Sequence, residues 1–195
     1  SWNSALGSTD NRPNLISLGR KLRAVDRSFT APLQAKDAAL AFARECSNGK
    51  QPITDNARAK MSDLISLLDS DAVRLLMRDL TDDLVMSRNS NQSVRLIDLF
   101  GNSLTLESDL TGDQIVRRIF GPLLADANAK ALDWLVYSIG LRPELFVELP
   151  EETATDFARR LARASQTDHS LTGRVLGVAN LLNLKLDDLG DPAPA

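Results

Sequence analysis

The chain has 195 residues, of which 43% are hydrophobic and 25% are charged, and its formal net charge is -3. These values are typical of a folded soluble protein, and they exclude an intrinsically disordered chain and a chain that is basic overall. No apolar run approaches the roughly 20 residues that span a bilayer, so we expect no membrane span and a soluble protein, either cytoplasmic or secreted.

Residues 1–13 mix serine, asparagine, glycine and aspartate without any sustained periodicity, which predicts a flexible N-terminal arm. Leucines recur at helical spacing over 14–27 and predict the first helix. Because the chain begins at Ser1 rather than at a methionine, we interpret it as a region of a larger or secreted bacterial protein.

Helix signals follow one another closely through the next part of the chain. Pro32 is well placed as the first residue of a helix, and Thr54 is typical of an N-cap. The clearest amphipathic pattern begins at Ser70, and Gly101 is predicted as the left-handed stop of a later, short helix. Together these signals predict an N-terminal helical subdomain over 14–101.

Leu104, Leu106 and Leu110 alternate with polar residues, which is the pattern either of one short strand or of a loop anchored by leucines. A lone strand would have no partner for its backbone hydrogen bonds. We therefore interpret 102–110 as the connection between two helical subdomains.

The second half of the chain again carries helix signals. The pair Gly121-Pro122 is predicted to end one helix and to begin another. Pro150, with two acidic residues after it, predicts the start of a further helix that has arginines at its far end. A last helix is predicted from Ser170 onward.

These elements predict an all-α fold, an irregular multi-helix bundle of about ten short helices. The C-terminal helical subdomain covers 111–189, and a loose tail covers 190–195. No segment recurs at a fixed period, so the sequence does not favour a solenoid.

Cys46 and His169 are the only thiol and the only imidazole in the sequence. A cysteine–histidine nucleophile is therefore the one covalent mechanism that these residues allow. Cys46 is predicted near a helix C-terminus, where the helix dipole disfavours the thiolate that such chemistry needs. One cysteine and one histidine are also too few for a zinc site. We therefore predict no catalytic residue, no cofactor and no metal, and we favour a non-enzymatic role.

Apolar and basic side chains remain as candidates for contact with a partner. One group contains aromatic and aliphatic residues over 134–146, which are typical of a binding groove. The other contains three arginines, which attract phosphate or an acidic partner unless they stabilise the end of their own helix. We predict partner contacts from Trp134, Tyr137, Leu141, Phe146, Arg159, Arg160 and Arg163.

These observations favour a helical protein–protein interaction domain without enzymatic activity. Two alternatives stay open. An effector-type transferase or ligase-like domain acts by positioning a partner's own reactive group and needs no internal nucleophile or metal. A helical nucleic-acid-binding domain would use the arginines, but the acidic net charge disfavours nucleic acid as a partner.

Overall fold

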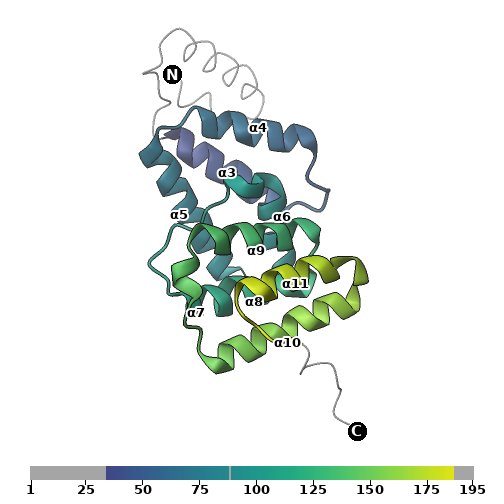
Figure 1. Ribbon diagram of the computed structural model, residues 1–195. Coiled ribbons are helices and arrows are strands. Elements are labelled where there is room, and N and C mark those ends of the chain that lie inside the picture. Colours follow the sequence, from purple (N-terminus) through teal and green to yellow (C-terminus); the bar gives the residue numbers. More distant parts are fainter. Residues whose placement is uncertain (1–33, 88, 187–195) are drawn as a thin grey trace.

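The computed structural model describes residues 34–87 and 89–186, and the element labels follow Figure 1. Within these ranges the fold is all-α and contains no strand, which confirms the predicted class. The predicted arm at 1–13, the predicted first helix at 14–27 and the predicted tail at 190–195 lie outside the described residues.

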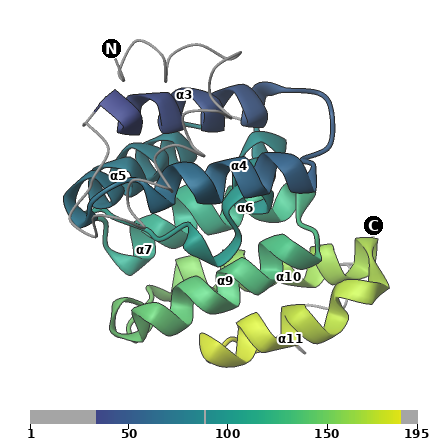
Figure 2. The ribbon, with the colours of Figure 1, turned by 90° about the horizontal axis from the view of Figure 1, so that it is seen from above.

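Long helices make up the first part of the described chain. They are α3 (Gln34–Asn48), α4 (Asp55–Ser66), α5 (Ser70–Met86) and α6 (Ser90–Phe100), and a short 3-10 turn, η1 (Gly101–Ser103), follows α6. Figure 2 shows α3 and α4 toward one side of the molecule and α9 and α11 toward the other.

The second part of the described chain alternates short and long helical elements. They are α7 (Gly112–Ile115), the π-helical turn η2 (Val116–Phe120), α8 (Gly121–Leu123), η3 (Leu124–Asp126), α9 (Ala129–Leu141), η4 (Pro143–Phe146), α10 (Glu151–Thr167), η5 (His169–Leu171) and α11 (Thr172–Leu181). In Figure 1, α9 crosses the middle of the molecule, with α11 and then α10 below it.

Side-chain caps begin several of these helices. The hydroxyl of Thr54 accepts a hydrogen bond from the Ala57 amide at 3.2 Å, which confirms the predicted N-cap of α4. α5 begins at Ser70 as predicted, and the carboxylate of Asp69 caps it by accepting from the Ala72 amide at 2.8 Å. The start predicted at Pro32 lies outside the described residues.

One hydrophobic cluster runs through both parts of the described chain. Helix α6 connects them, because it packs against α3 and α4 on one side and against α8 and α9 on the other. The buried side chains of both parts belong to this same cluster, so the core marks no boundary between two subdomains in the described residues. The division at 14–101 and 111–189 stays a prediction.

The segment between the two parts is a loop anchored by buried groups rather than a strand. Leu104 is fully buried, and its carbonyl accepts a hydrogen bond from the indole N–H of Trp134 at 2.8 Å. The hydroxyl of buried Thr81 on α5 accepts from the Glu107 amide at 3.1 Å. These bonds satisfy backbone groups that a lone strand would leave unpaired.

Phe120 forms the centre of the aromatic part of the core. Its ring lies 5.7 Å from that of Phe146, 6.0 Å from that of Trp134 and 6.4 Å from that of Phe157, measured between ring centroids. These separations are typical of favourable aromatic pairs. Four elements, η2, η4, α9 and α10, are therefore fixed around one side chain.

A new element, α8, begins at Gly121 as predicted, with Pro122 in its first turn, but the backbone stays helical across this boundary from Gly112 to Asp126. The amide of Gly121 donates to the carbonyl of Val116, which is a π-helical bond. A proline in a regular α-helix has no amide proton to donate, and its ring collides with the carbonyl four residues earlier. The wider turn before Pro122 relieves this conflict, so the backbone stays helical through the proline.

Gly101 ends α6 with φ of +55° and ψ of -137°. The positive φ expected of a helix stop is confirmed, but this ψ lies outside the left-handed helical region. Glycine populates such a conformation almost alone, because it has no Cβ.

We predict that Gly112→Ala destabilises the fold by about 3 kcal/mol, since overpacking of this kind displaces backbone. A Cβ at Gly112 would lie 1.8 Å from the carbonyl oxygen of Leu145, which is too short for any contact. The measurement is the free energy of unfolding from urea titrations followed by circular dichroism.

Gly140→Ala in α9 is the matched control, because a Cβ there meets nothing within 4 Å. Alanine has the higher helix propensity, so this variant should gain up to about 1 kcal/mol. Equal stability of the two variants would show that α7 and η4 do not pack at the distance described.

Candidate functional site

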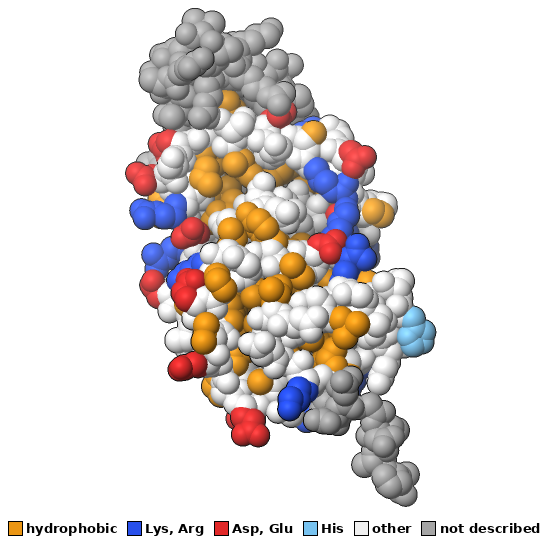
Figure 3. All heavy atoms as spheres, in the orientation of Figure 1, with side chains coloured by type: hydrophobic (Ala, Val, Ile, Leu, Met, Phe, Trp, Pro, Cys, Tyr) orange, Lys and Arg blue, Asp and Glu red, His pale blue; other side chains and the backbone are white. Residues whose placement is uncertain are grey.

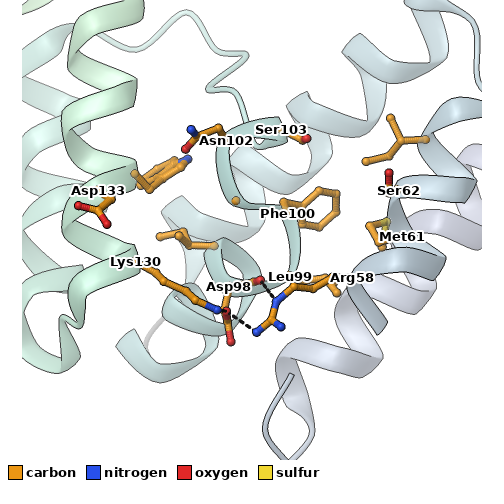
Figure 4. A pocket seen from close by; sticks show the side chains of 14 residues that line it. Arg58, Met61, Ser62, Asp98, Leu99, Phe100, Asn102, Ser103, Lys130 and Asp133 are labelled. Atoms are coloured by element: carbon orange, nitrogen blue, oxygen red, sulfur yellow. Dashed lines mark hydrogen bonds and ion pairs between the residues drawn. The ribbon is translucent and has the colours of Figure 1, made fainter. Parts of the chain in front are cut away.

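A groove of about 520 Å³ lies between α4 and α9. In Figure 4 side chains of α4 line one wall, those of α9 line the other, and the end of α6 with η1 lies between them. Its volume is within the roughly 300–1,000 Å³ of ligand-binding clefts. We call it the α4–α9 groove, and it is lined by Arg58, Met61, Ser62, Ile65, Ile97, Asp98, Leu99, Phe100, Gly101, Asn102, Ser103, Lys130, Asp133 and Trp134.

The floor of the groove is apolar. Met61 and Phe100 expose 1% and 7% of their surface, and Ile65 is half-buried beside them. Ser62, Asn102 and Ser103 are exposed at the rim. The groove therefore combines an apolar base with a polar edge, which is the usual composition of a site that binds another molecule.

One end of the groove is closed by a carboxylate between two cations. Asp98 of α6 accepts a hydrogen bond from Arg58 of α4 at 2.8 Å and another from the ammonium of Lys130 of α9 (Figure 4). Arg58 also donates through Nε to the backbone carbonyl of Asp98 at 3.0 Å. These bonds tie the three helices that form the groove to one another.

Electrostatics keep Asp98 ionised. Partial burial alone would raise the pKa of its carboxyl group, but the hydrogen bonds from Lys130 and Arg58, with the charges of both groups, hold the pKa below its ordinary value. Arg58 also pairs with Asp55 at 2.5 Å, so the charges of this cluster balance. Lys130 is its more exposed cation, with 58% of its side chain accessible.

A second apolar surface adjoins the groove on the far side of α9. Asp133 pairs with Arg174 at 2.8 Å, and a Cβ at Gly177 would lie 4.0 Å from Val136, so α9 and α11 run parallel in direct contact. We call their exposed apolar part the α9–α11 surface. It contains half-buried Val136 and Tyr137 together with Leu141, Leu176 and Leu181, which are 47–49% exposed.

Figure 3 shows how these side chains are distributed on one face of the molecule. Hydrophobic side chains run down the middle of this face, over α4, α9 and α11, while charged side chains gather toward its edges. Contiguous exposed apolar surface of this kind marks interaction sites more often than isolated exposed leucines do.

The structure separates the predicted apolar contact residues into two groups. Trp134 and Phe146 are 1% and 6% exposed and pack with Phe120 in the core. Trp134 also lines the α4–α9 groove, and contact of either residue with a partner stays a prediction. Tyr137 and Leu141 lie at the α9–α11 surface, where their contact with a partner stays a prediction.

The predicted position of the arginines at the end of their helix is wrong. α10 continues to Thr167, and its last turn contains no basic residue. Arg159 and Arg160 both pair with Asp156, at 3.5 and 2.8 Å. Because the dipole effect is confined to the last turn, it does not explain these side chains. All three arginines, including Arg163, are exposed on α10.

Sequence reasoning missed the charged end of the α4–α9 groove. Arg58, Asp98 and Lys130 belong to three separate helices, and no local spacing connects them. The exposure of Leu176 could have been predicted from helical spacing, because this residue falls outside the stripe formed by Val175 and Val178 on α11.

The remaining candidates for chemistry are placed as follows. Cys46 is half-buried in α3, and His169 is exposed in η5. Within the described ranges, no group of three or more histidine, cysteine, aspartate or glutamate side chains is arranged to hold a metal ion. None of the helices described is long and apolar enough to cross a membrane.

Comparison with protein-family models, with curated proteins and with solved structures gives no match to this chain.

We predict that Asp98→Asn lowers the free energy of unfolding by about 1 kcal/mol at neutral pH, because it removes the charge shared by Arg58 and Lys130. The lowered pKa of Asp98 stabilises the fold above the ordinary pKa of an aspartate, and this contribution is lost as the pH falls through the lowered value. The difference between the variant and the parent chain should therefore shrink in acid.

Urea titrations at neutral and acid pH measure this difference. Asp82→Asn, at an exposed position of α5, is the control and should leave stability unchanged at either pH. A difference at Asp98 that persists undiminished in acid would show that the ion pairs are not its source.

Proposed function

We propose that this chain is a non-enzymatic protein–protein interaction domain. Its binding surface is the α4–α9 groove together with the adjoining α9–α11 surface, and its partner is an amphipathic helix of another protein. The proposal rests on one observation, an open groove with an apolar floor between α4 and α9.

The shape of the surface supports a helical partner. The groove lies between two helices and offers a base made by Met61, Ile65 and Phe100. An amphipathic helix places apolar side chains at intervals of three and four residues, and these fit an elongated groove with an apolar base. Leu141 and Leu176 extend the same kind of contact beyond α9.

The charged end of the groove supports an orientation for that partner. Lys130 donates one of its three ammonium protons to Asp98 and is largely exposed, so it has donors left for a second acceptor. An acidic residue at one end of the partner helix would add a carboxylate there. Such a contact gives register and orientation more than it gives affinity.

Site-specific photo-crosslinking tests the proposal. Benzoylphenylalanine is placed at Ser62 in the groove, at Leu176 on the α9–α11 surface and at Arg78 on α5. Each protein is irradiated in lysate of the source organism, with and without nuclease treatment. We expect the same partner to be captured from Ser62 and Leu176 but not from Arg78, which is exposed on a different helix.

The crosslinked segment, identified by mass spectrometry, should carry apolar residues at helical spacing with an acidic residue at one end. Capture that is equal from all three positions would contradict a defined binding surface. Capture that disappears after nuclease treatment would favour the nucleic-acid-binding alternative, and a covalently modified partner would favour a transferase.

A further inference from the structure

A second, smaller groove lies along α10, away from the α4–α9 groove. Its volume is about 170 Å³, and it is formed by α10, the helical segment of α8 and η3, and the chain that follows α10. We call it the α10 groove, and it is lined by Gly121, Leu124, Ala125, Ala127, Arg160, Arg163, Ala164, Thr167, Asp168 and Leu171.

The base of the α10 groove is apolar. Leu124, Ala164 and Leu171 are buried beneath it, and Ala127 is half-buried beside them. The volume is smaller than the roughly 300 Å³ at which clefts for small molecules begin. It is suited to a single apolar side chain of a larger partner.

Two arginines stand at the edge of this base. The stem of Arg160 passes over Gly121, where a Cβ would lie 3.6 Å from the arginine Cδ, and its guanidinium pairs with Asp156 at 2.8 Å. Arg163 forms no ion pair with any described residue and is exposed. Guanidinium groups next to an apolar base bind carboxylates well, because they are weakly hydrated and present several donors in one plane.

Glycine at position 121 is part of this arrangement. A Cβ there would also lie 3.1 Å from the carbonyl of Val116, inside the π-helical turn. The stem of Arg160 lies at ordinary contact distance from this position, so the tight approach at Gly121 is that of the Val116 carbonyl. The guanidinium at the groove edge is held by its ion pair with Asp156.

We infer that the α10 groove binds an acidic segment of a partner protein, with one apolar side chain on the base and carboxylates at Arg160 and Arg163. This inference does not rest on the proposed function, because it concerns different residues and a different helix. The α10 groove would be a second binding site, which prefers acidic ligands, besides the apolar surface of the α4–α9 groove.

Charge and shape favour an acidic peptide over nucleic acid here. Asp156 and Asp168 lie at the two ends of the arginine pair, and they would repel a phosphate backbone that continued past the groove. A peptide needs carboxylates only beside its apolar residue. The apolar base likewise fits an aliphatic side chain and offers a phosphate no hydrogen bond.

Selection from random peptides displayed on phage tests the inference with the whole chain as bait. Enriched peptides are synthesised, and their binding is measured by fluorescence anisotropy against the parent chain, against R160A/R163A and against R74A/R78A. Arg74 and Arg78 are exposed arginines of α5 and provide a control of equal charge change.

We expect enriched peptides with a leucine, isoleucine or phenylalanine among acidic residues. Their binding should weaken about tenfold in R160A/R163A, which corresponds to about 1.4 kcal/mol, and should not change in R74A/R78A. Ala127→Leu, which fills the base and leaves every charge in place, should weaken binding by a similar factor. Circular dichroism establishes that each variant is folded.

Three results would overturn the inference. One is enrichment of peptides without acidic residues, and another is binding that R160A/R163A leaves unchanged. The third is tighter binding of polyuridylic acid than of any selected peptide, with loss in R160A/R163A, which would assign the arginines to nucleic acid. None of these results affects crosslinking from Ser62, so the two sites are tested separately.

Discussion

The packing of aromatic rings around Phe120 is the constraint on which the remaining structure depends. The ring lies on η2 and contacts Trp134, Phe146 and Phe157. Trp134 in turn holds the carbonyl of Leu104, so the connection between the two parts of the chain is tied to the same cluster. Burial of large aromatic surface drives this packing, and the indole hydrogen bond gives it one orientation.

Both candidate surfaces are built on this cluster. Trp134 lies at the base of the α4–α9 groove, and Gly121, the residue after Phe120, lines the α10 groove. The same helix, α9, forms a wall of the first groove and half of the α9–α11 surface. The positions of the surface residues therefore depend on rings that are almost completely buried.

Features that depend on neighbouring residues, such as helix caps, could be predicted from the sequence. Contacts between distant parts of the chain could not. Thr54 caps its helix through bonds within one turn, so its pattern was sufficient. The ion pairs of Asp98 with Arg58 and Lys130 form only when three helices pack together, so no spacing in the sequence predicts them. Trp134 and Tyr137 are three residues apart on α9, yet packing against Phe120 buries the first more deeply than the second. The arginines of α10 were misplaced because no residue signalled that the helix continues to Thr167.

The π-helical turn also sets the rotational phase of the helix that contains it. Each residue of an α-helix turns the next by about 100°, so the extra residue of a π turn offsets everything after it by about that angle. Arg117 lies inside the π turn and donates to the hydroxyl of Thr153, near the start of α10, at 2.7 Å. Gly121 follows the π turn and faces Arg160, two turns further along α10. Deletion of a single residue within Val116–Phe120 would return the turn to α geometry and leave Leu123 and Leu124 facing the core, but the ring of Pro122 would then collide with the carbonyl four residues earlier.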